Sequence, residues 1–237
     1  MTLYLVGIGL NDEKDISVKG LEIVRKADKI YLDVYTSKMN CSTKDLEKFY
    51  GKKIVEAGRE MLENKSNLII DEAKKKEVAL LIIGSPTAAT THSNFIIEGK
   101  KNNVDVKVVE NASVFSAVGI TGLFLYKFGQ TVSIPHDNKN LSSPYEKFRE
   151  NDKLGLHTLF LLDVDKKLMT VKEALDYLIK SGLDKNRKVV GCGALGSDEP
   201  EIKCGKASEV KINEFPQCLV IPGELHFKEE EALEIYK

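Results

Sequence analysis

Short apolar runs recur along the chain and are separated by longer amphipathic stretches. The runs are LYLVG at 3–7, VALLIIG at 78–84, VKVVE at 106–110, TLFLLDV at 158–164, KVVGCG at 188–193 and CLVIPG at 218–223. They are too short for helices and too apolar for strands with one face in water. The pattern therefore predicts strands that are covered on both faces, as in parallel sheets.

Helical periodicity fills the stretch at 170–181. Thr170 and Glu173 fit a capping box at its start, and Gly182 suits its end. The apolar residues of this stretch fall on one stripe and are Val171, Ala174, Leu175, Leu178 and Ile179. The sequence therefore predicts an amphipathic helix here.

A second helix is predicted over 18–27, with Val18, Leu21 and Val24 facing the core. Strands that alternate with helices indicate an α/β protein with largely parallel or mixed sheets. About six to nine such units make either one large sheet or two smaller ones.

The middle of the chain carries small residues and glycines in the stretch NASVFSAVGITGLFLYKFGQTVSIP, which follows a complete run of strands and helices. We place a boundary there and predict two α/β domains, 1–112 and 113–237. The polar segment PHDNKNLSSP at 135–144 is predicted to be a loop.

Composition narrows the class of partner. Of 237 residues, 42% are hydrophobic and 30% are charged, which is typical of a globular protein. The 35 Lys and Arg balance 36 Asp and Glu, so the net charge of -1 provides no field to attract nucleic acid or anionic lipid. We therefore expect neither partner, and we interpret the basic run at 74–76 as a solvated helix face.

The four cysteines, Cys41, Cys192, Cys204 and Cys218, form no CxxC pair, so the sequence predicts neither a zinc site nor a redox dithiol. We expect reduced thiols and a cytoplasmic protein. No cationic leader precedes TLYLVGIGL, and no apolar run approaches the roughly 18 residues that span a bilayer. Secretion and membrane insertion are therefore not expected.

A literal GxGxxG occurs at Gly191–Gly196. In a dinucleotide site a helix opens at such a motif and presents its amides to a pyrophosphate. Here SDEPEIKCGKA follows, with clustered acids and Pro200, which argues against that interpretation. We expect a glycine-permitted bend at the end of a strand.

Two other turns follow predicted strands. GIGLND at 7–12 has glycines that leave the backbone accessible to a ligand. In GSPTAATTH at 84–92, Pro86 restricts the turn, and Thr90, Thr91 and Ser93 are predicted N-caps for a helix. Ligands of open α/β sheets bind beyond the carboxyl ends of strands, where both turns lie.

Together, these stretches resemble the diphthine synthases, which are tetrapyrrole-methylase-like methyltransferases that use S-adenosylmethionine. The segments that carry the resemblance are LYLVGIGLNDEKDISVKGLEIVRKAD, YLDVYTS, SPTAATTH, NASVFSAVGITGLFLYKFGQTVS, GLHTLFLLDVD and LVIPGELH, in this order along the chain. The resemblance covers nearly the whole chain and is more specific than any single glycine motif.

The resemblance implies two α/β domains with S-adenosylmethionine in a cleft between them, and a homodimer. It also implies methylation of the amino group of 3-amino-3-carboxypropyl-histidine on translation elongation factor 2, a step toward diphthamide, with S-adenosylhomocysteine as the product of the donor. Eukaryotic members carry a long insertion after the strand that corresponds to TVSI and also esterify the carboxylate. This chain lacks the insertion, so we expect the trimethylated product.

Cofactor contacts are carried over from the family where the motifs align. They are Leu10 in the first turn, Ser85 and Ala88 in the second, Ser113 and Val114 in NASVF, Leu162 at a strand end, Leu195 in the glycine bend, and Gln217. The family usually has Gly-Asp-Pro followed by a large apolar residue where this chain has GSPT. Ser85 therefore replaces an acid, and we expect the contacts of this turn to be mostly main chain.

Methyl transfer from a sulfonium to an amine is a direct displacement, so the protein's main task is to align the reactants, which is worth roughly 7–11 kcal/mol in favourable systems. His92, His157 and Asp163 are the available general bases near the expected site. Each also has a plain structural interpretation at the start of a helix or at the end of a strand. We assign no catalytic residue and no metal ligand.

Three rival hypotheses remain from the sequence. A nicotinamide-dependent oxidoreductase needs a helix that opens at Gly196. A tetrapyrrole methyltransferase of the same fold needs room for a macrocycle, and the matches at GITGLFLYKFG and GLHTL disfavour it. A non-catalytic binding protein is the third, because Ser85 departs from the family pattern.

Overall fold

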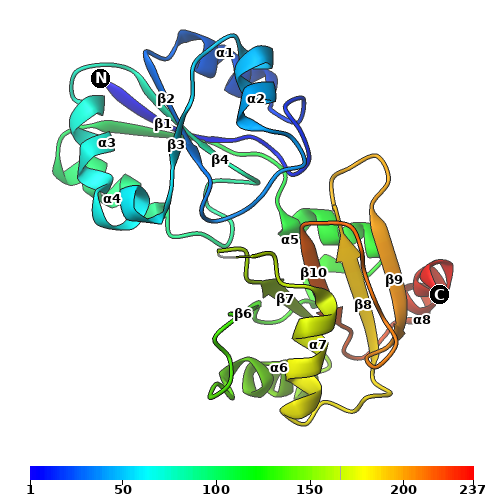
Figure 1. Ribbon diagram of the computed structural model, residues 1–237. Coiled ribbons are helices and arrows are strands. Elements are labelled where there is room, and N and C mark those ends of the chain that lie inside the picture. Colours follow the sequence, from blue (N-terminus) through cyan, green and yellow to red (C-terminus); the bar gives the residue numbers. More distant parts are fainter. Residues whose placement is uncertain (166) are drawn as a thin grey trace. The chain divides into compact units, whose positions relative to one another are not determined.

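The chain forms two compact units, Met1–Val114 and Phe115–Lys237 (Figure 1). The structure is a computed structural model that describes residues 1–165 and 167–237. Each unit contains one five-stranded sheet with helices packed on it. The prediction of an α/β fold with parallel and mixed sheets is confirmed, and the sequence placed the boundary between the units at residue 112.

The sheet of the first unit is entirely parallel and has the order β3-β2-β4-β1-β5. Its strands are β1 (Thr2–Gly7), β2 (Lys29–Asp33), β3 (Val55–Ala57), β4 (Val78–Ile82) and β5 (Asp105–Val109). The strand β4 lies in the middle of the order and is buried at every position, because helices cover both faces of the sheet.

Two pairs of helices cover the faces of this sheet (Figure 1). On one face, α1 (Val18–Lys26) and α2 (Thr43–Tyr50) pack in a common hydrophobic cluster. On the other, a short π-helix, η1 (Glu60–Asn64), leads into α3 (Ser66–Ala73), which packs with α4 (Ser93–Lys101). These two clusters make up the core of the unit.

The first helix begins where the sequence predicts but turns a different face inward. Val24 is buried as expected, whereas Val18 is 76% exposed, so that part of the prediction is wrong. Gly20 is buried instead, and a Cβ atom there would lie 3.0 Å from Val6 and from Ile16. The close approach of the helix to β1 at a glycine shifts the buried stripe away from Val18.

The sheet of the second unit is mixed and has the order β6-β7-β10-β8-β9. Only β6 and β7 pair in parallel, and the other neighbours are antiparallel. The strands are β6 (Val132–Ile134), β7 (Thr158–Leu162), β8 (Lys188–Gly193), β9 (Glu201–Lys206) and β10 (Gln217–Ile221).

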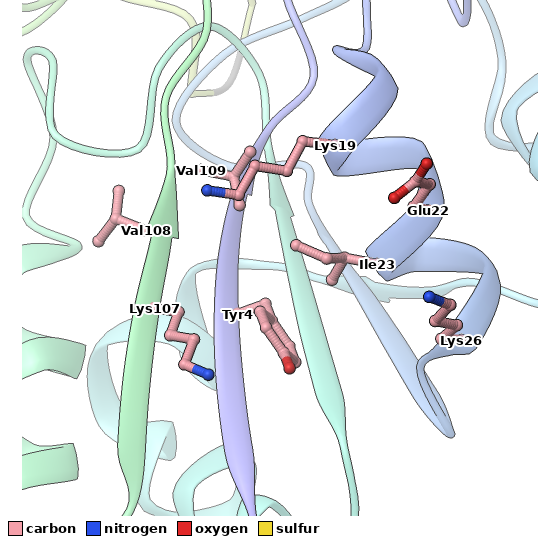
Figure 2. Close-up of a pocket in the computed structure, with 8 residues that line it drawn as sticks. All are labelled: Tyr4, Lys19, Glu22, Ile23, Lys26, Lys107, Val108 and Val109. Atoms are coloured by element: carbon pink, nitrogen blue, oxygen red, sulfur yellow. The ribbon is translucent and has the colours of Figure 1, made fainter.

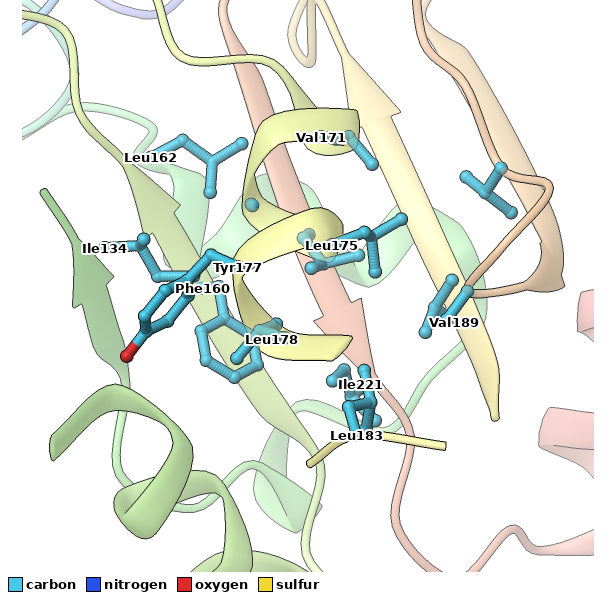
Figure 3. Close-up of a cluster of buried hydrophobic side chains, with 14 of the residues drawn as sticks. Ile134, Phe160, Leu162, Val171, Leu175, Tyr177, Leu178, Leu183, Val189 and Ile221 are labelled. Carbon is cyan, nitrogen blue, oxygen red and sulfur yellow. The ribbon is translucent and has the colours of Figure 1, made fainter. Parts of the chain in front are cut away.

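The core of this unit lies between α7 (Val171–Lys180) and the sheet. Figure 3 shows Leu175 and Leu178 of this helix among side chains from the strands, such as Phe160 and Ile221. The predicted capping box is present, because Thr170 and Glu173 bond to each other's main chain. The remaining helical segments are α5 (Val114–Ala117), η2 (Val118–Thr121), η3 (Leu125–Lys127), α6 (Ser143–Lys153), α8 (Phe227–Leu233) and η4 (Glu234–Tyr236).

All six predicted strands are present, although β5 ends one residue before its apolar run and β4, β7 and β10 end two residues before theirs. The loop predicted at 135–144 ends earlier than expected, because Pro144 lies in the first turn of α6. The six apolar runs cover none of the strands β2, β3, β6 and β9. For β9 the reason is that its sequence EIKCGK is polar and that it lies at the edge of the sheet.

The GxGxxG stretch forms the predicted bend at the end of a strand, and the next element of the chain is a strand, not a helix. Gly191 and Gly193 end β8, and the chain then returns as β9. A Cβ atom on Gly193 would lie 2.4 Å from the carbonyl oxygen of Glu214. These glycines therefore serve the close packing of a neighbouring segment on the sheet.

Candidate functional site

The turns after β1 and β4 bond to each other at the carboxyl edge of the first sheet. The amide of Gly84 donates to the carbonyl of Gly9 at 2.7 Å, and Gly84 has a φ of 81°. A Cβ atom on Gly84 would make ordinary van der Waals contact, 3.7 Å from the Leu10 side chain and 3.8 Å from the Ala112 carbonyl oxygen. The two turns thus meet at the edge where ligands of α/β sheets bind.

Gly7, the last residue of β1, lies under the turn that follows β4. A Cβ atom at this position would lie 2.7 Å from the Gly84 carbonyl oxygen and 3.0 Å from Pro86. From the β5 side, the Asn111 amide group donates to the carbonyls of Gly7 and Asp15, each at 3.0 Å. The ends of β1, β4 and β5 therefore form one connected edge.

The first turn holds its own shape through Asp15. Its carboxylate accepts the amides of Leu10 at 3.0 Å and Asn11 at 2.7 Å. Gly9 is required here, because its φ is 83° and a Cβ atom would lie 2.2 Å from the Cβ of Asp15. The Leu10 amide is thus already bonded, and the half-buried side chain of Leu10 is the part of this residue left for a ligand.

The five cofactor residues predicted in the first unit lie in the turns and segment that make this edge. Leu10 follows β1, Ser85 and Ala88 follow β4, and Ser113 and Val114 follow β5. Ser85 is buried, and the other four are half-buried.

Ser85 has a partner that the sequence did not suggest. Its hydroxyl donates a hydrogen bond to the carboxylate of Glu110, which follows β5 directly. The sequence had indicated that Ser85 removes an acid from this turn. In the structure, the Glu110 side chain brings a carboxylate to the turn from a neighbouring strand.

A buried network fixes the rest of the second turn. The Nε2 atom of His92 lies 3.1 Å from the carboxylate of Asp33, and its Nδ1 lies 2.6 Å from the hydroxyl of Thr90. Asp33 also accepts the amides of Tyr35 and Thr36 and the Thr36 hydroxyl. Burial raises the pKa of Asp33, but the hydrogen bonds from His92 and Thr36 outweigh it and leave the pKa below its usual value.

This network replaces the helix caps that the sequence predicted. The N-cap position of α4 is His92, and no side chain caps the helix there. Thr90 instead accepts the His92 amide at 3.0 Å and donates to the Pro86 carbonyl at 3.1 Å. The prediction of hydroxyl caps is therefore wrong, because the Thr90 hydroxyl bonds within the turn.

In the second unit, the register of the sheet brings two predicted residues together. Cys218 pairs with Leu161 and Gln217 pairs with Gly193, which places Gln217 between the end of β7 at Leu162 and the end of β8. Leu195 lies in the bend that follows β8 and is buried. All three lie at one edge of this sheet.

The Gln217 side chain is occupied by the fold. Its Oε1 accepts the Val171 amide at 2.7 Å, and its Nε2 donates to the Ile212 carbonyl at 2.9 Å. Gln217 is also buried. These bonds connect α7 to the sheet, so this side chain offers a ligand no polar atom without a partner.

His157 lies at the start of β7, at the opposite end of the strand from Leu162. It is fully buried. Its Nδ1 atom accepts a hydrogen bond from the Gly223 amide at 3.0 Å, and its Nε2 atom lies 2.8 Å from the Glu229 carboxylate. Burial lowers the pKa of His157 and outweighs the opposing effect of Glu229. The tautomer with a proton on Nε2 satisfies both contacts, so His157 anchors α8.

Asp163 and His92, the other two candidate bases, are also engaged in local structure. The Asp163 carboxylate accepts the amides of His136 at 2.9 Å and Asp165 at 3.0 Å, and so closes the loop after β7. Both ring nitrogens of His92 have partners in the network described above. These contacts agree with the plain structural interpretation of all three residues.

One pocket lies away from these edges. It has a volume of about 530 Å³ and lies between α1 and the strands β1 and β5 (Figure 2). Its lining is Tyr4, Lys19, Glu22, Ile23, Lys26, Lys107, Val108 and Val109. None of the predicted site residues is among them, and three of the eight lining residues are lysines of α1 and β5. We therefore place the candidate site at the strand ends.

Two further observations concern the residues that the structure describes. No helix in that part of the chain is both long and apolar enough to cross a bilayer. Within the same residues, no group of three or more His, Cys, Asp or Glu side chains is arranged to hold a metal ion.

Comparison with protein families gives one match over most of the chain. The profile of the Tetrapyrrole (Corrin/Porphyrin) Methylases matches residues 2–211. A protein of Arabidopsis thaliana named "Probable diphthine methyl ester synthase" is 42% identical over 271 aligned positions, which cover 99% of this chain and 98% of that protein. The diphthine synthase of Methanocaldococcus jannaschii is 40% identical, with 98% and 97% covered.

A solved structure is also similar. A crystal structure of diphthine synthase superposes with a TM-score of 0.95 at 37% identity, and the match covers 100% of this chain and 96% of that one. The similarity therefore includes both units.

Proposed function

The chain belongs to the diphthine synthase family of the tetrapyrrole methylases and is a methyltransferase, and from this premise we propose its reaction. It transfers methyl groups from S-adenosylmethionine to the amino group of 3-amino-3-carboxypropyl-histidine on translation elongation factor 2. The product is diphthine, an intermediate of diphthamide biosynthesis.

The observation that carries the proposal is the chemistry of the strand ends. In the first unit, the predicted cofactor residues lie at the carboxyl edge of a parallel sheet, on segments that bond to one another there. Their side chains are small, apolar or hydroxylic, and one carboxylate stands beside them. A donor with apolar, hydroxyl and cationic groups fits such a surface.

When bound, S-adenosylmethionine supplies a methyl group that is already activated on its sulfonium. We assign its binding to Leu10, Ser85, Ala88, Ser113 and Val114 of the first unit and to Leu162 and Leu195 of the second. The Gln217 side chain acts by holding α7 on the sheet. These residues hold and orient the reactants and exclude water, which is the contribution that a direct displacement requires.

The number of methyl groups is part of the proposal. We propose three additions to the amino nitrogen, since the insertion of eukaryotic members is missing from this chain. The alignment with the Arabidopsis protein spans 271 positions against the 237 residues of this chain, so that relative contains additional residues. Its name favours a second candidate, in which a fourth methyl group esterifies the carboxylate.

We propose a cytoplasmic homodimer. The four cysteines are free thiols, as the reducing cytoplasm maintains them. Exposed apolar side chains at the start of the second unit, at Phe115, Ile120, Leu125 and Tyr126, are candidates for the surface that a second copy covers. Sedimentation of the purified protein tests the dimer directly.

The decisive experiment incubates the protein with isotopically labelled S-adenosylmethionine and elongation factor 2 that carries the unmethylated intermediate. Label on the factor is expected, and mass spectrometry counts three added methyl groups or four. A factor without the modified histidine is the control. Label on a corrin or porphyrin precursor in a parallel reaction, with none on the factor, would instead identify a tetrapyrrole methyltransferase.

A further inference from the structure

Glu110 joins two of the segments assigned to the cofactor. The Ser85 hydroxyl donates to its carboxylate, and the Thr87 hydroxyl lies 3.1 Å from one carboxylate oxygen and 3.3 Å from the other. Ser85 is only 6% exposed, whereas the Glu110 side chain is exposed. A buried hydroxyl thus fixes an exposed carboxylate in one position.

The neighbours of Glu110 fix it from the other side. The next residue, Asn111, is anchored by its two amide hydrogen bonds to the first turn and to the end of β1. Ser113 and Val114 follow closely in the chain. The carboxylate therefore has its backbone in the β5 segment and its hydrogen-bond partners in the turn after β4, on a rigid edge.

The charge of Glu110 has no partner within the described chain. Some other acids of the protein form ion pairs, such as Glu173 with Lys167 and Glu229 with Lys127. Among residues 1–165 and 167–237, no Lys or Arg forms an ion pair with Glu110, and its two donors are neutral hydroxyls. A fixed carboxylate without a cation is able to bind a cationic group of a ligand.

We propose that Glu110 binds the α-ammonium group of the methyl donor, a role that rests on the proposed function. An ammonium group has N–H donors that hydrogen bond to a carboxylate, whereas a sulfonium has none. Ser85 and Thr87 act as positioning residues, because their hydroxyls orient the carboxylate. The same ammonium is present in S-adenosylhomocysteine and is missing from 5′-methylthioadenosine, which lacks the amino-acid part.

Calorimetric titration of Glu110→Gln with these three ligands tests the proposal. S-adenosylmethionine and S-adenosylhomocysteine are each expected to bind about tenfold more weakly or worse, whereas 5′-methylthioadenosine binds as it does to the wild type. Ser85→Asp in the Glu110→Gln background returns a carboxylate to the turn and is expected to restore part of the loss. Asp105→Asn, at the other end of β5, is the matched control and leaves all three affinities unchanged.

The outcomes separate this inference from the proposed function. Unchanged binding of all three ligands by Glu110→Gln, or an equal loss for all three, overturns the assignment of Glu110. A loss for S-adenosylmethionine alone also overturns it, because the carboxylate would then face the sulfonium. A wild type that binds none of the three contradicts the proposed function itself. Thermal unfolding of the variant confirms that it is folded.

Discussion

His92 and Asp33 form a buried pair, with Nε2 of His92 3.1 Å from the Asp33 carboxylate, and this pair fastens the turn after β4 to the end of β2. Asp33→Ala leaves His92 and two main-chain amides without their acceptor. The free energy of unfolding is expected to fall by about 3–5 kcal/mol. Urea unfolding measures this free energy. Asp33→Asn is the control, and its free energy of unfolding is expected to fall by less because the asparagine keeps a hydrogen-bond acceptor. An unchanged midpoint for Asp33→Ala would contradict the role of the pair.

Glu229 predicts a loss of stability in acid. Burial raises its pKa, but hydrogen bonds from the His226 and Phe124 amides, Lys127 and His157 outweigh it and hold the pKa at about 2. Because this value is below that of the unfolded chain, the stabilisation is complete above about pH 4.3 and is lost as the pH falls toward 2. It amounts to about 3 kcal/mol. Unfolding by urea at a series of pH values should show a smaller decline for Glu229→Gln than for the wild type, and part of the decline should remain because the pKa values of Glu173 and Glu201 are also lowered to about 2.

His157 is expected to cause a second decrease in stability, which begins at a higher pH than the one caused by Glu229. Its folded pKa is lowered, so below about pH 6.5 the unfolded chain binds a proton that the folded chain does not. Stability should therefore decrease as the pH falls from 7 toward 5, before Glu229 begins to titrate. His157→Gln removes the titrating group and is expected to flatten this part of the curve, although its baseline stability is lower. A slope that survives the substitution would assign the effect to another group.

Gly7→Ala tests the contact between the end of β1 and the turn above it. The added Cβ atom meets the Gly84 carbonyl oxygen at 2.7 Å and Asn111 at 2.8 Å, both parts of fixed structure. We expect a loss of about 1–3 kcal/mol in the free energy of unfolding and weaker binding of S-adenosylmethionine. Gly58→Ala is the matched control, because a Cβ atom there has nothing within 4 Å. Equal stability of the two variants would show that the turn is free to move.

Two valines of α1 test which face of this helix is buried, through the effect of replacing each on the free energy of unfolding. Val24 is 0% exposed and Val18 is 76% exposed. Val24→Ala is expected to lower the free energy of unfolding by about 1.5–3 kcal/mol, and Val18→Ala to change it by less than about 0.5 kcal/mol. Urea unfolding of both variants distinguishes the observed face from the predicted one, on which Val18 and Val24 contribute alike.

Strands that are buried on both faces were predictable, because nearly all of their residues are apolar and together they form a short, continuous apolar run. The run VALLIIG predicted β4 in this way. In contrast, β9 buries only one of its six residues and the short β3 only one of three, so their sequences resemble loops. The face of α1 was misjudged because Gly20 counts as neither apolar nor polar in a periodic pattern.

The location of the candidate site could be predicted from the sequence, but the hydrogen bonds between its residues could not. Glycines and hydroxylic residues after apolar runs pointed to the strand ends, where the turns lie. The bond between Ser85 and Glu110 joins residues that the chain separates by a helix and a strand, and the one between His92 and Asp33 joins the start of α4 to the end of β2. Such pairs depend on strand order, which periodicity does not reveal.

The strand order of the first sheet also bears on how the protein is made. The strand β1 is synthesised before β4 and β5, the two strands with which it pairs, so neither of these partners exists until residue 78 has been synthesised. Until then an apolar segment with two open edges remains in the nascent chain, where it is prone to aggregate. Chaperone binding to stalled chains is therefore expected to persist up to the emergence of β4 and to fall once that strand has passed the exit tunnel.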